Sequence, residues 1–221
     1  AGNNSCGSRS IAWGNMVHNV LGAQAWLADG TLLDWGRFEA ATGRMRQIGD
    51  EVRALAESLR PEIEANWPTV LRRVAGYNLD VFCNRNERPY TGDGSVNLAH
   101  LLVGSEGTLA VTRSLTLALS ELPRAKVLGV VNFPTFYRAM DAAQHIVRMG
   151  GSTLTAVELV DRTMIELSLQ NPAFAPTVRT ALSPHINHGQ PDAVLLVEFS
   201  GPDKASLLPQ LRALVELMGD L

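Results

Sequence analysis

Two short stretches far apart in the chain combine residues that could bind a phosphorylated cofactor. Near the start, Asn3-Asn4-Ser5-Cys6-Gly7 joins small polar side chains to a glycine. Near the middle, Leu101–Thr112 reads LLVGSEGTLAVT, with Gly104 and Gly107 on either side of a polar turn. Glycine lets a ligand approach the backbone closely, and successive N–H groups in such turns can hold an anion. Taken alone, the second stretch favours a plain hairpin with a bulge over a binding site.

The composition excludes several functional classes. The chain has 221 residues, of which 46% are hydrophobic and 19% charged, with a net charge of −3. This is an ordinary globular composition without a basic field for a nucleic-acid backbone, so we expect no nucleic-acid partner. No apolar run approaches the roughly 20 residues that span a bilayer, so we expect no transmembrane segment. Cys6 and Cys83 cannot form a disulfide framework, and we expect reduced thiols in a cytosolic protein.

One pair of histidines has the spacing of metal ligands. His185 and His188 are separated by two residues and lie between Pro184 and Gly189, in a predicted loop. Two imidazoles without a third ligand nearby in sequence make a weak metal site. We therefore assign no metal-binding role to this pair.

The elements that would position the first stretch are predicted to be loops followed by a hairpin. Val20–Leu27 and Thr31–Leu33 flank Asp29-Gly30, which is a hairpin signal. A helix is then expected to begin at an Asp50 N-cap and to end at Pro61. The spacing of apolar residues thus predicts a short sheet followed by helix.

The segment between this helix and the second stretch is predicted to be helical and then irregular. Helical spacing continues over residues 63–74, with Arg72 and Arg73 as favourable charges at the C-terminal end of a helix. Residues 83–97 are polar and rich in Pro and Gly, which predicts a surface loop. The Leu101–Thr112 stretch then predicts two strands around its turn, the second one reaching Leu119.

The last hundred residues alternate between strand and helix patterns. Strands are expected over 126–133, 154–159 and 193–199, and helices over 136–149, 161–169 and 207–218, with an irregular stretch over 172–191. This order predicts helices packed on one sheet. The boundary with the first part is expected near Pro123.

Three ordered motif blocks resemble the FAD-linked oxidases and dehydrogenases of the vanillyl-alcohol oxidase type, which share a PCMH-type FAD-binding domain. The blocks are Asn3–Gly7; Trp13-Gly14 with Asn19–Gly22 and Ala28–Gly30; and Gly76–Leu79 with Gly104–Leu109. The residues in these blocks are most similar to those of the large fused proteins in which a flavin domain and cap precede an iron–sulfur domain. These include D-lactate and D-2-hydroxyglutarate dehydrogenases.

The resemblance implies an α+β fold in two parts. Residues 1–122 would be the second half of a PCMH-type FAD-binding domain, and residues 123–221 a partial ferredoxin-like cap domain that binds substrate. The chain begins without methionine and is interpreted as a fragment of a longer protein. Alone, it is expected to be inactive and to retain little or no FAD.

The resemblance also implies which residues bind the cofactor. The pyrophosphate and isoalloxazine side and the adenosine end would be held by Asn3, Asn4, Ser5, Cys6, Gly7, Gly14, Asn19, Glu106, Gly107, Thr108, Leu109 and Val111. Arg9 is a candidate for a substrate carboxylate because a guanidinium suits a bidentate contact, although a surface salt bridge is the alternative. No catalytic residue is assigned.

The activity implied is FAD-dependent oxidation of a D-2-hydroxy acid, of the D-lactate, D-2-hydroxyglutarate or glycolate type, by hydride transfer to the flavin. Partners would be the hydroxy acid and an electron acceptor or iron–sulfur domain, with a cluster and a divalent metal in regions outside these residues. The expected location is the cytoplasm, or the periphery of the inner membrane. Two alternatives stay open: a non-catalytic FAD-fold module, and a sugar-nucleotide reductase of the same flavin fold.

Overall fold

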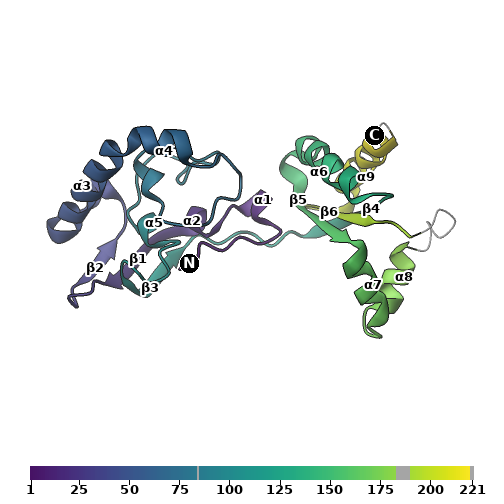
Figure 1. Cartoon of the computed structure of the whole chain (residues 1–221), viewed down its shortest axis with the longest axis horizontal. Coiled ribbons are helices and arrows are strands. Elements are labelled where there is room, and N and C mark those ends of the chain that lie inside the picture. Colours follow the sequence, from purple (N-terminus) through teal and green to yellow (C-terminus); the bar gives the residue numbers. More distant parts are fainter. Residues whose placement is uncertain (84, 183–189, 220–221) are drawn as a thin grey trace. The chain divides into compact units, whose positions relative to one another are not determined.

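The chain folds into two compact units, Ala1–Ser120 and Glu121–Leu221, as the computed structural model in Figure 1 shows. The structure describes residues 1–83, 85–182 and 190–219. Each unit combines helices with a three-stranded sheet, which confirms the predicted α+β class. The two units are described separately below.

The first unit is built on an antiparallel sheet whose central strand is β1. Its strands are β1 (Val20–Trp26), β2 (Leu32–Trp35) and β3 (Val111–Leu117), in the order β2-β1-β3. The β1–β2 hairpin is confirmed, and its turn has a local cause. The amide of Thr31 donates to the Asp29 carboxylate at 2.9 Å, and Gly30 takes a φ of +81° that favours glycine.

Short helices surround this sheet. They are α1 (Ser10–Trp13), α2 (Met16–Asn19), α3 (Gly43–Ser58), α4 (Arg60–Asn66) and α5 (Ala99–Leu102), with 3-10 turns η1 (Phe38–Ala40) and η2 (Leu79–Phe82). The core beneath them includes Val17, Val20, Ala25, Leu98 and Val103. These residues come from the segment after the Asn3–Gly7 loop, from the sheet and from the segment before Gly104. Burial of their apolar area therefore brings the two motif stretches close together.

The strand predicted over residues 101–103 is wrong, because Leu101 and Leu102 belong to helix α5 and Val103 directly follows it. The side chain of Asn97 accepts a hydrogen bond from the amide of Ala99 at 2.9 Å and so starts the helix. All four residues of α5 are buried, so the segment has no polar face and its apolar run cannot distinguish a helix from a strand. The strand that follows, β3, ends at Leu117 rather than Leu119.

The predicted helix boundaries between residues 43 and 74 are also wrong. Helix α3 begins after Thr42, eight residues before the expected N-cap Asp50, and α4 ends at Asn66. Pro61 lies in the first turn of α4, where its missing N–H costs nothing. The chain from Trp67 to Asn78 is not helical, so Arg72 and Arg73 do not close a helix.

The second unit is an antiparallel sheet in the order β4-β6-β5. Its elements are β4 (Ala125–Phe133), α6 (Phe136–Gly150), η3 (Gly151–Thr153), β5 (Leu154–Asp161), α7 (Arg162–Gln170), α8 (Ala175–Leu182), β6 (Ala193–Gly201) and α9 (Lys204–Gly219). Helices α6 and α9 lie on one face of the sheet (Figure 1). The predicted alternation is confirmed, except that α8 occupies part of the stretch expected to be irregular.

Capping side chains fix where two of these helices begin. The hydroxyl of Thr135 accepts from the amide of Arg138 at 3.3 Å, and the carboxylate of Asp161 accepts from the amide of Met164 at 2.9 Å. The Asp161 cap was predicted and is confirmed. Phe199, at the end of the central strand, is fully buried beneath this helical layer.

Candidate cofactor-binding site

The two stretches with cofactor-binding character meet in the first unit. The amide of Glu106 donates to the carbonyl of Gly2 at 2.9 Å, and the amide of Gly104 donates to the carbonyl of Ala1 at 3.3 Å. A Cβ atom placed on Gly2 would lie 3.8 Å from the Glu106 Cα. The loop Asn3–Gly7 and the turn Gly104–Thr108 are therefore neighbours, although about a hundred residues separate them in sequence.

Both stretches hold backbone conformations that L-residues avoid. Within the described residues, Asn4 (φ +47°) and Glu106 (φ +51°) are the non-glycine residues with positive φ. Gly104 and Gly107 take φ of +88° and +82°. Such conformations persist only where the surroundings impose them, and they concentrate at binding sites. The coincidence of both strained residues with the two motifs supports a binding role.

Asn4 anchors the first loop from inside the protein. Its side chain is fully buried, and its Oδ1 accepts from the amide of Val17 at 3.0 Å. Its Nδ2 is buried and has no partner among the described residues. A buried amide donor without an acceptor lowers the stability of the fold. This unused donor lies in the loop that contains the predicted cofactor contacts.

The Gly76–Leu79 segment packs against the Gly104–Thr108 turn and the residues directly before it. A Cβ on Gly104 would lie 2.8 Å from the carbonyl oxygen of Gly76, so only glycine allows this approach. The hydroxyls of Tyr77 and Thr108 are 2.8 Å apart. Nδ2 of the buried Asn78 side chain donates to the carbonyls of His100 and Val103, at 2.9 and 2.7 Å. Asn78 thereby holds the chain directly before the turn.

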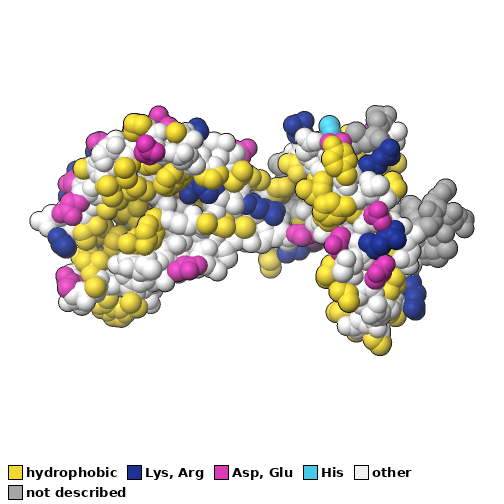
Figure 2. Space-filling view, viewed as in Figure 1, with side chains coloured by type: hydrophobic (Ala, Val, Ile, Leu, Met, Phe, Trp, Pro, Cys, Tyr) yellow, Lys and Arg dark blue, Asp and Glu magenta, His cyan; other side chains and the backbone are white. Residues whose placement is uncertain are grey.

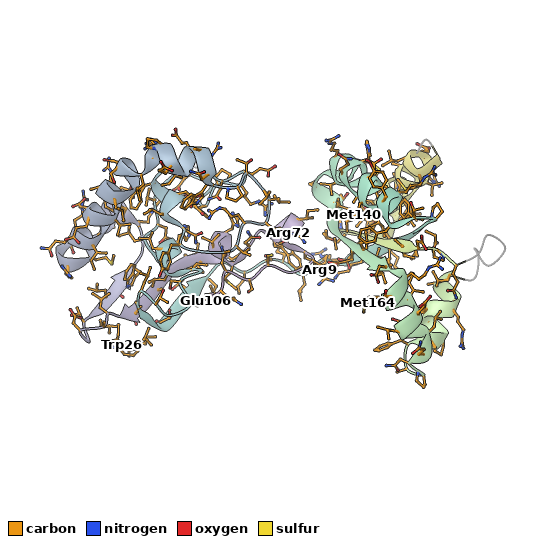
Figure 3. All side chains as sticks on the ribbon, viewed as in Figure 1. Arg9, Trp26, Arg72, Glu106, Met140 and Met164 are labelled. Carbon is orange, nitrogen blue, oxygen red and sulfur yellow. The ribbon has the colours of Figure 1, made fainter. Side chains whose placement is uncertain are left out.

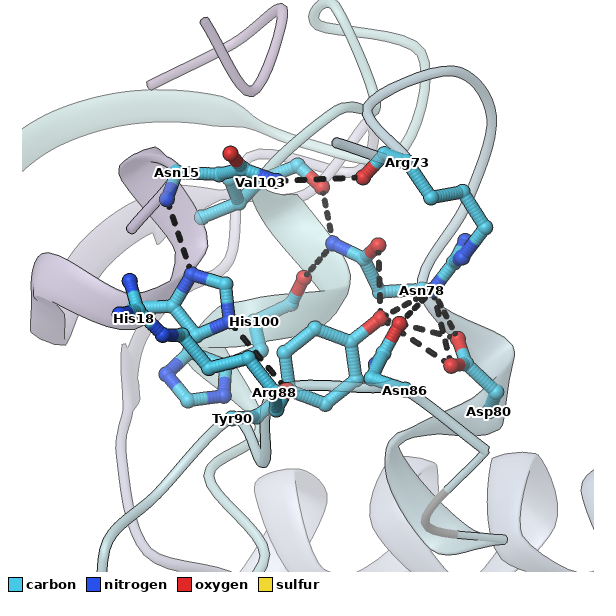
Figure 4. Close-up of polar contacts among 10 residues, drawn as sticks. All are labelled: Asn15, His18, Arg73, Asn78, Asp80, Asn86, Arg88, Tyr90, His100 and Val103. Atoms are coloured by element: carbon cyan, nitrogen blue, oxygen red, sulfur yellow. Dashed lines mark hydrogen bonds and ion pairs between the residues drawn. The ribbon is translucent and has the colours of Figure 1, made fainter. Parts of the chain in front are cut away.

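A buried polar network lies behind this segment (Figure 4). Nη2 of Arg73 is 2.8 Å from both carboxylate oxygens of Asp80, which is fully buried. The hydroxyl of Tyr90 donates to Asp80 and to the side chain of Asn78, at 3.0 and 3.1 Å. Burial, and secondarily the charge of Asp80, raise the pKa of Tyr90, so this phenol stays protonated. Arg73 is thus a buried ion-pair partner, which corrects its predicted role as a helix-end charge.

Six of the predicted site residues line one cavity of about 450 Å3. They are Ser5, Cys6, Gly7, Arg9, Gly14 and Asn19, and the opposite wall is formed by residues 117–120. The guanidinium of Arg9 lies over the ring of Trp13, 5.6 Å from its centroid. No Cβ contact within 4 Å would form at Gly7, so space beside that backbone is open. The cavity combines exposed backbone with a cation.

The remaining predicted residues lie elsewhere in the unit. Glu106, Gly107 and Thr108 form the turn described above, and Asn3 and Asn4 form the loop beside it. Leu109 lines a different cavity, and Val111 opens β3 with 64% of its surface exposed. The side-chain Nδ2 of Asn19 already donates to the carbonyls of Trp13 and Asn15, which gives that residue a structural role.

Two arginines near the loop were missed as site residues. Arg88 donates to the carbonyls of Ser10, Ile11 and Ala12 at 3.2–3.4 Å, and Arg72 donates to the carbonyl of Ser8 at 3.2 Å. Figure 3 shows Arg72 and Arg9 at the same end of the first unit. Neither contact has a sequence signal, because each joins residues more than 60 positions apart. Both contacts hold the segment that follows the Asn3–Gly7 loop.

His100 gives the first unit a dependence on pH. Its Nε2 is 3.0 Å from the carbonyl of Val20, so this nitrogen carries the hydrogen, and the buried Nδ1 has no partner among the described residues. Burial lowers the pKa of His100 below its ordinary 6.5, and burial does the same for His18. The unfolded chain therefore binds more protons than the folded one below about pH 6.5, so stability falls as pH falls.

We expect the urea concentration at the unfolding midpoint of the first unit to decrease when the pH is lowered from 7.5 to 5.5. His100→Gln, which keeps a donor for Val20 but cannot titrate, should reduce that pH dependence by up to about 1.4 kcal/mol per pH unit. Tryptophan fluorescence is a suitable signal because Trp13, Trp26, Trp35 and Trp67 all belong to the first unit. An equal pH dependence in wild type and variant would contradict the assignment to His100.

Metal binding finds no support in the described part of the chain, where no group of three or more His, Cys, Asp or Glu could hold an ion. His185 and His188 lie outside the described residues. Among the helices that the structure describes, none has the length and apolar character needed to cross a membrane.

Comparison with known families finds a likeness for the second unit. Residues 122–221 match the family described as FAD linked oxidases, C-terminal domain. Over these residues the chain is similar to that family, and the resemblance to FAD-linked oxidases drawn from the motifs is confirmed at that level.

Comparison with individual proteins extends the likeness to the whole chain. It is 26% identical over 226 residues to D-2-hydroxyglutarate dehydrogenase of Escherichia coli, covering 97% of this chain and 21% of that protein. It is 28% identical over 165 residues to the probable mitochondrial D-lactate dehydrogenase of Danio rerio, covering 75% of this chain and 24% of that protein. The chain thus spans about a fifth to a quarter of these relatives' length.

A solved structure shares the fold. Alkyldihydroxyacetonephosphate synthase superposes with a TM-score of 0.59 at 18% identity, covering 99% of this chain and 30% of that one. At this identity the likeness concerns the fold alone.

Proposed function

We propose that the chain contributes to an FAD-dependent oxidoreductase that oxidises a 2-hydroxy acid. In this proposal the Ala1–Ser120 unit is the second half of an FAD-binding domain, and the Glu121–Leu221 unit is the cap over the substrate. The observation that carries the proposal is the meeting of the Asn3–Gly7 loop and the Gly104–Thr108 turn, with both strained non-glycine residues at that junction.

The residues present fit a flavin dinucleotide. A pyrophosphate needs N–H donors and little side-chain bulk, and Gly7 and Gly107 both have open space where a Cβ would lie. Asn4 retains a buried side-chain amide nitrogen without a partner in the part of the chain that the structure describes, and Arg9 supplies a cation at the cavity wall. Glu106 is exposed and can accept from ribose or adenine donors.

FAD, when bound, would supply the redox chemistry by accepting a hydride from the carbon that bears the hydroxyl. The chain's own residues bind and orient. In the proposal, Ser5 to Gly7 hold the pyrophosphate side, Glu106 to Thr108 hold the adenosine end, and Arg9 faces the substrate carboxylate. The proton acceptor for the substrate hydroxyl is not assigned to any residue of this chain.

The substrate class rests on the relatives. Those compared above are a D-2-hydroxyglutarate and a probable D-lactate dehydrogenase, which supports a D-2-hydroxy acid and leaves its identity to experiment. The match of residues 122–221 to the oxidase C-terminal domain favours this reading over a sugar-nucleotide reductase. The electron acceptor, an iron–sulfur domain, a divalent metal and a cytoplasmic or membrane-peripheral location stay predictions.

The activity is tested with the chain and with any longer polypeptide that contains it. Each is reconstituted with FAD, freed of oxygen and mixed with D-2-hydroxyglutarate, D-lactate or glycolate. We expect the flavin absorption band to bleach with one D-2-hydroxy acid in the longer polypeptide, and not with the matching L-enantiomer. A longer polypeptide that takes up no FAD, or that oxidises NADPH instead, would contradict the proposal.

A further inference from the structure

The polar stretch over residues 83–97, predicted as a surface loop, sends one side chain to the wall of the proposed cofactor site. This side chain is the partly buried Arg88. Its Nη1 donates to the carbonyl of Ser10 at 3.3 Å, and its Nη2 donates to the carbonyls of Ile11 and Ala12, at 3.2 and 3.4 Å. The planar fork of a guanidinium suits such a contact, because its donors are held in a fixed geometry.

These carbonyls belong to the helical turn that forms one side of the cavity of about 450 Å3. Helix α1 has only four residues, and Arg9, Ser10, Trp13 and Gly14 of this segment line the cavity. The last carbonyls of a helix lack donors within it, and one isolated turn is too short to be stable by itself. The position of this wall must therefore come from contacts outside α1, and Arg88 supplies such contacts.

Gly14 is the residue that lets Arg88 approach. It has a φ of +73°, and a Cβ atom there would lie 2.8 Å from Nη1 of Arg88 and 2.8 Å from Nδ1 of His18. Nδ1 of His18 accepts from the amide of Asn15 at 3.0 Å, so Nε2 carries the hydrogen and lies 3.4 Å from the Arg88 carbonyl (Figure 4). Both the side chain and the backbone of Arg88 are thus held where α1 ends and α2 begins.

Arg88 also brings a positive charge to this wall. Within the part of the chain that the structure describes, its side chain contacts carbonyl oxygens rather than a carboxylate. Figure 2 shows Lys or Arg side chains, in dark blue, at the end of the first unit where Figure 1 places α1. A cation that no carboxylate neutralises attracts anions to a neighbouring cavity. The pyrophosphate of a flavin dinucleotide is such an anion.

A purely structural role is the alternative, and the same loop contains the comparison for it. Nη2 of Arg85 donates to the carbonyl of Glu64 at 2.9 Å. This contact also joins a partly buried loop arginine to a backbone carbonyl. Neither Arg85 nor Glu64 lines the cavity beside α1. Loss of Arg85 should therefore disturb the loop without disturbing the cavity wall.

We propose that Arg88 is a positioning residue of the cofactor site. Its guanidinium fixes residues 8–14, so that Arg9 and the backbone beside it line the cavity before the cofactor arrives. Without this contact the ligand would have to order the segment on binding, and that loss of conformational entropy would weaken its affinity. The inference rests on the proposed function, because it takes FAD as the ligand of this cavity. It adds the stretch over residues 83–97 to the elements that build the site.

The first measurement follows amide hydrogen exchange in the isotope-labelled 221-residue chain without ligand. The amide of Gly14 donates to the carbonyl of Ser10 at 2.8 Å and so reports on the order of α1. We expect Arg88→Gln to raise the exchange rate of this amide at least about tenfold, because the turn loses its external contacts. Arg85→Gln should leave the rate unchanged.

The second measurement is the affinity for FAD, obtained from amide shifts during a titration. We expect Arg88→Gln to weaken binding at least about tenfold and Arg85→Gln by less than about twofold. Arg88→Lys should give an intermediate affinity, because its compact ammonium keeps the charge but cannot reach all of the carbonyls that the guanidinium contacts. A role confined to overall stability would give equal effects for the two glutamine variants.

Three results would overturn the role of Arg88. They are a Gly14 exchange rate that Arg88→Gln leaves unchanged or Arg85→Gln raises equally, an FAD affinity that Arg88→Gln leaves unchanged, and full affinity in Arg88→Lys, which would show that charge alone suffices. Failure of the proposed function looks different. In that case the wild-type chain binds no FAD, while Arg88→Gln still releases Gly14, which supports the hold of Arg88 on residues 8–14 and contradicts the cofactor.

Discussion

Replacing Asp80 by alanine is expected to lower the free energy of unfolding of the Ala1–Ser120 unit by about 3–5 kcal/mol. The substitution leaves Arg73, whose side chain is only 9% exposed, as a buried cation without its counter-charge. It also removes an acceptor from the hydroxyl of Tyr90. Both effects act on the network that holds Asn78 and, through it, the chain before Gly104.

Urea unfolding followed by tryptophan fluorescence measures this loss in the first unit alone. The matched control is Asp50→Ala on α3, which removes the partner of Arg46 from an ion pair of 2.9 Å whose side chains are 43% and 52% exposed. That variant should cost no more than about 0.5 kcal/mol. Equal costs for both variants would mean that the buried network does not stabilise the unit.

Gly104→Ala is expected to separate the two proposed walls of the cofactor site. Its Cβ would lie 2.8 Å from the carbonyl oxygen of Gly76 and would impose an L-residue at φ +88°. The conformation alone costs about 1–2 kcal/mol, and the contact forces the backbone of Gly76 to move as well. We therefore expect a loss of more than about 2 kcal/mol in the free energy of unfolding.

Gly94→Ala is the control that isolates the conformational part. Gly94 has φ +73° but no atom within 4 Å of the position of a Cβ. It should cost about 1–2 kcal/mol, as an open left-handed position does. Amide NMR spectra distinguish the two, because only Gly104→Ala should shift Gly2 and Asn4. Unperturbed Asn4 resonances in that variant would mean that Gly104 does not hold the walls together.

Sequence reasoning succeeded where a local signal fixes the structure. The Asp29-Gly30 hairpin and the Asp161 cap were predicted because the turn and the cap lie within three residues of their partners. The helices of the second unit other than α8 were predicted from apolar residues at helical spacing, and its central strand β6 from a short apolar run. The resemblance to FAD-linked oxidases could also be predicted, because the motif blocks occur in the expected order along the chain.

It failed where burial is uniform or partners are distant. Helix α5 is buried on every side, so its apolar run was read as a strand. Arg73 was predicted at a helix end, but it lies in a loop and pairs with Asp80, and no periodicity in the sequence reveals that pairing. The contact of Arg72 with Ser8 depends on tertiary structure alone.

The central claim, that the Asn3–Gly7 loop and the Gly104–Thr108 turn together bind FAD, is tested most directly by NMR. The isotope-labelled chain is titrated with FAD up to millimolar concentrations, which detects weak binding. We expect saturable amide shifts concentrated in these two stretches, weakened by Gly107→Ala and unaffected by Gly94→Ala. The absence of shifts there, or shifts restricted to other parts of the chain, would contradict the claim.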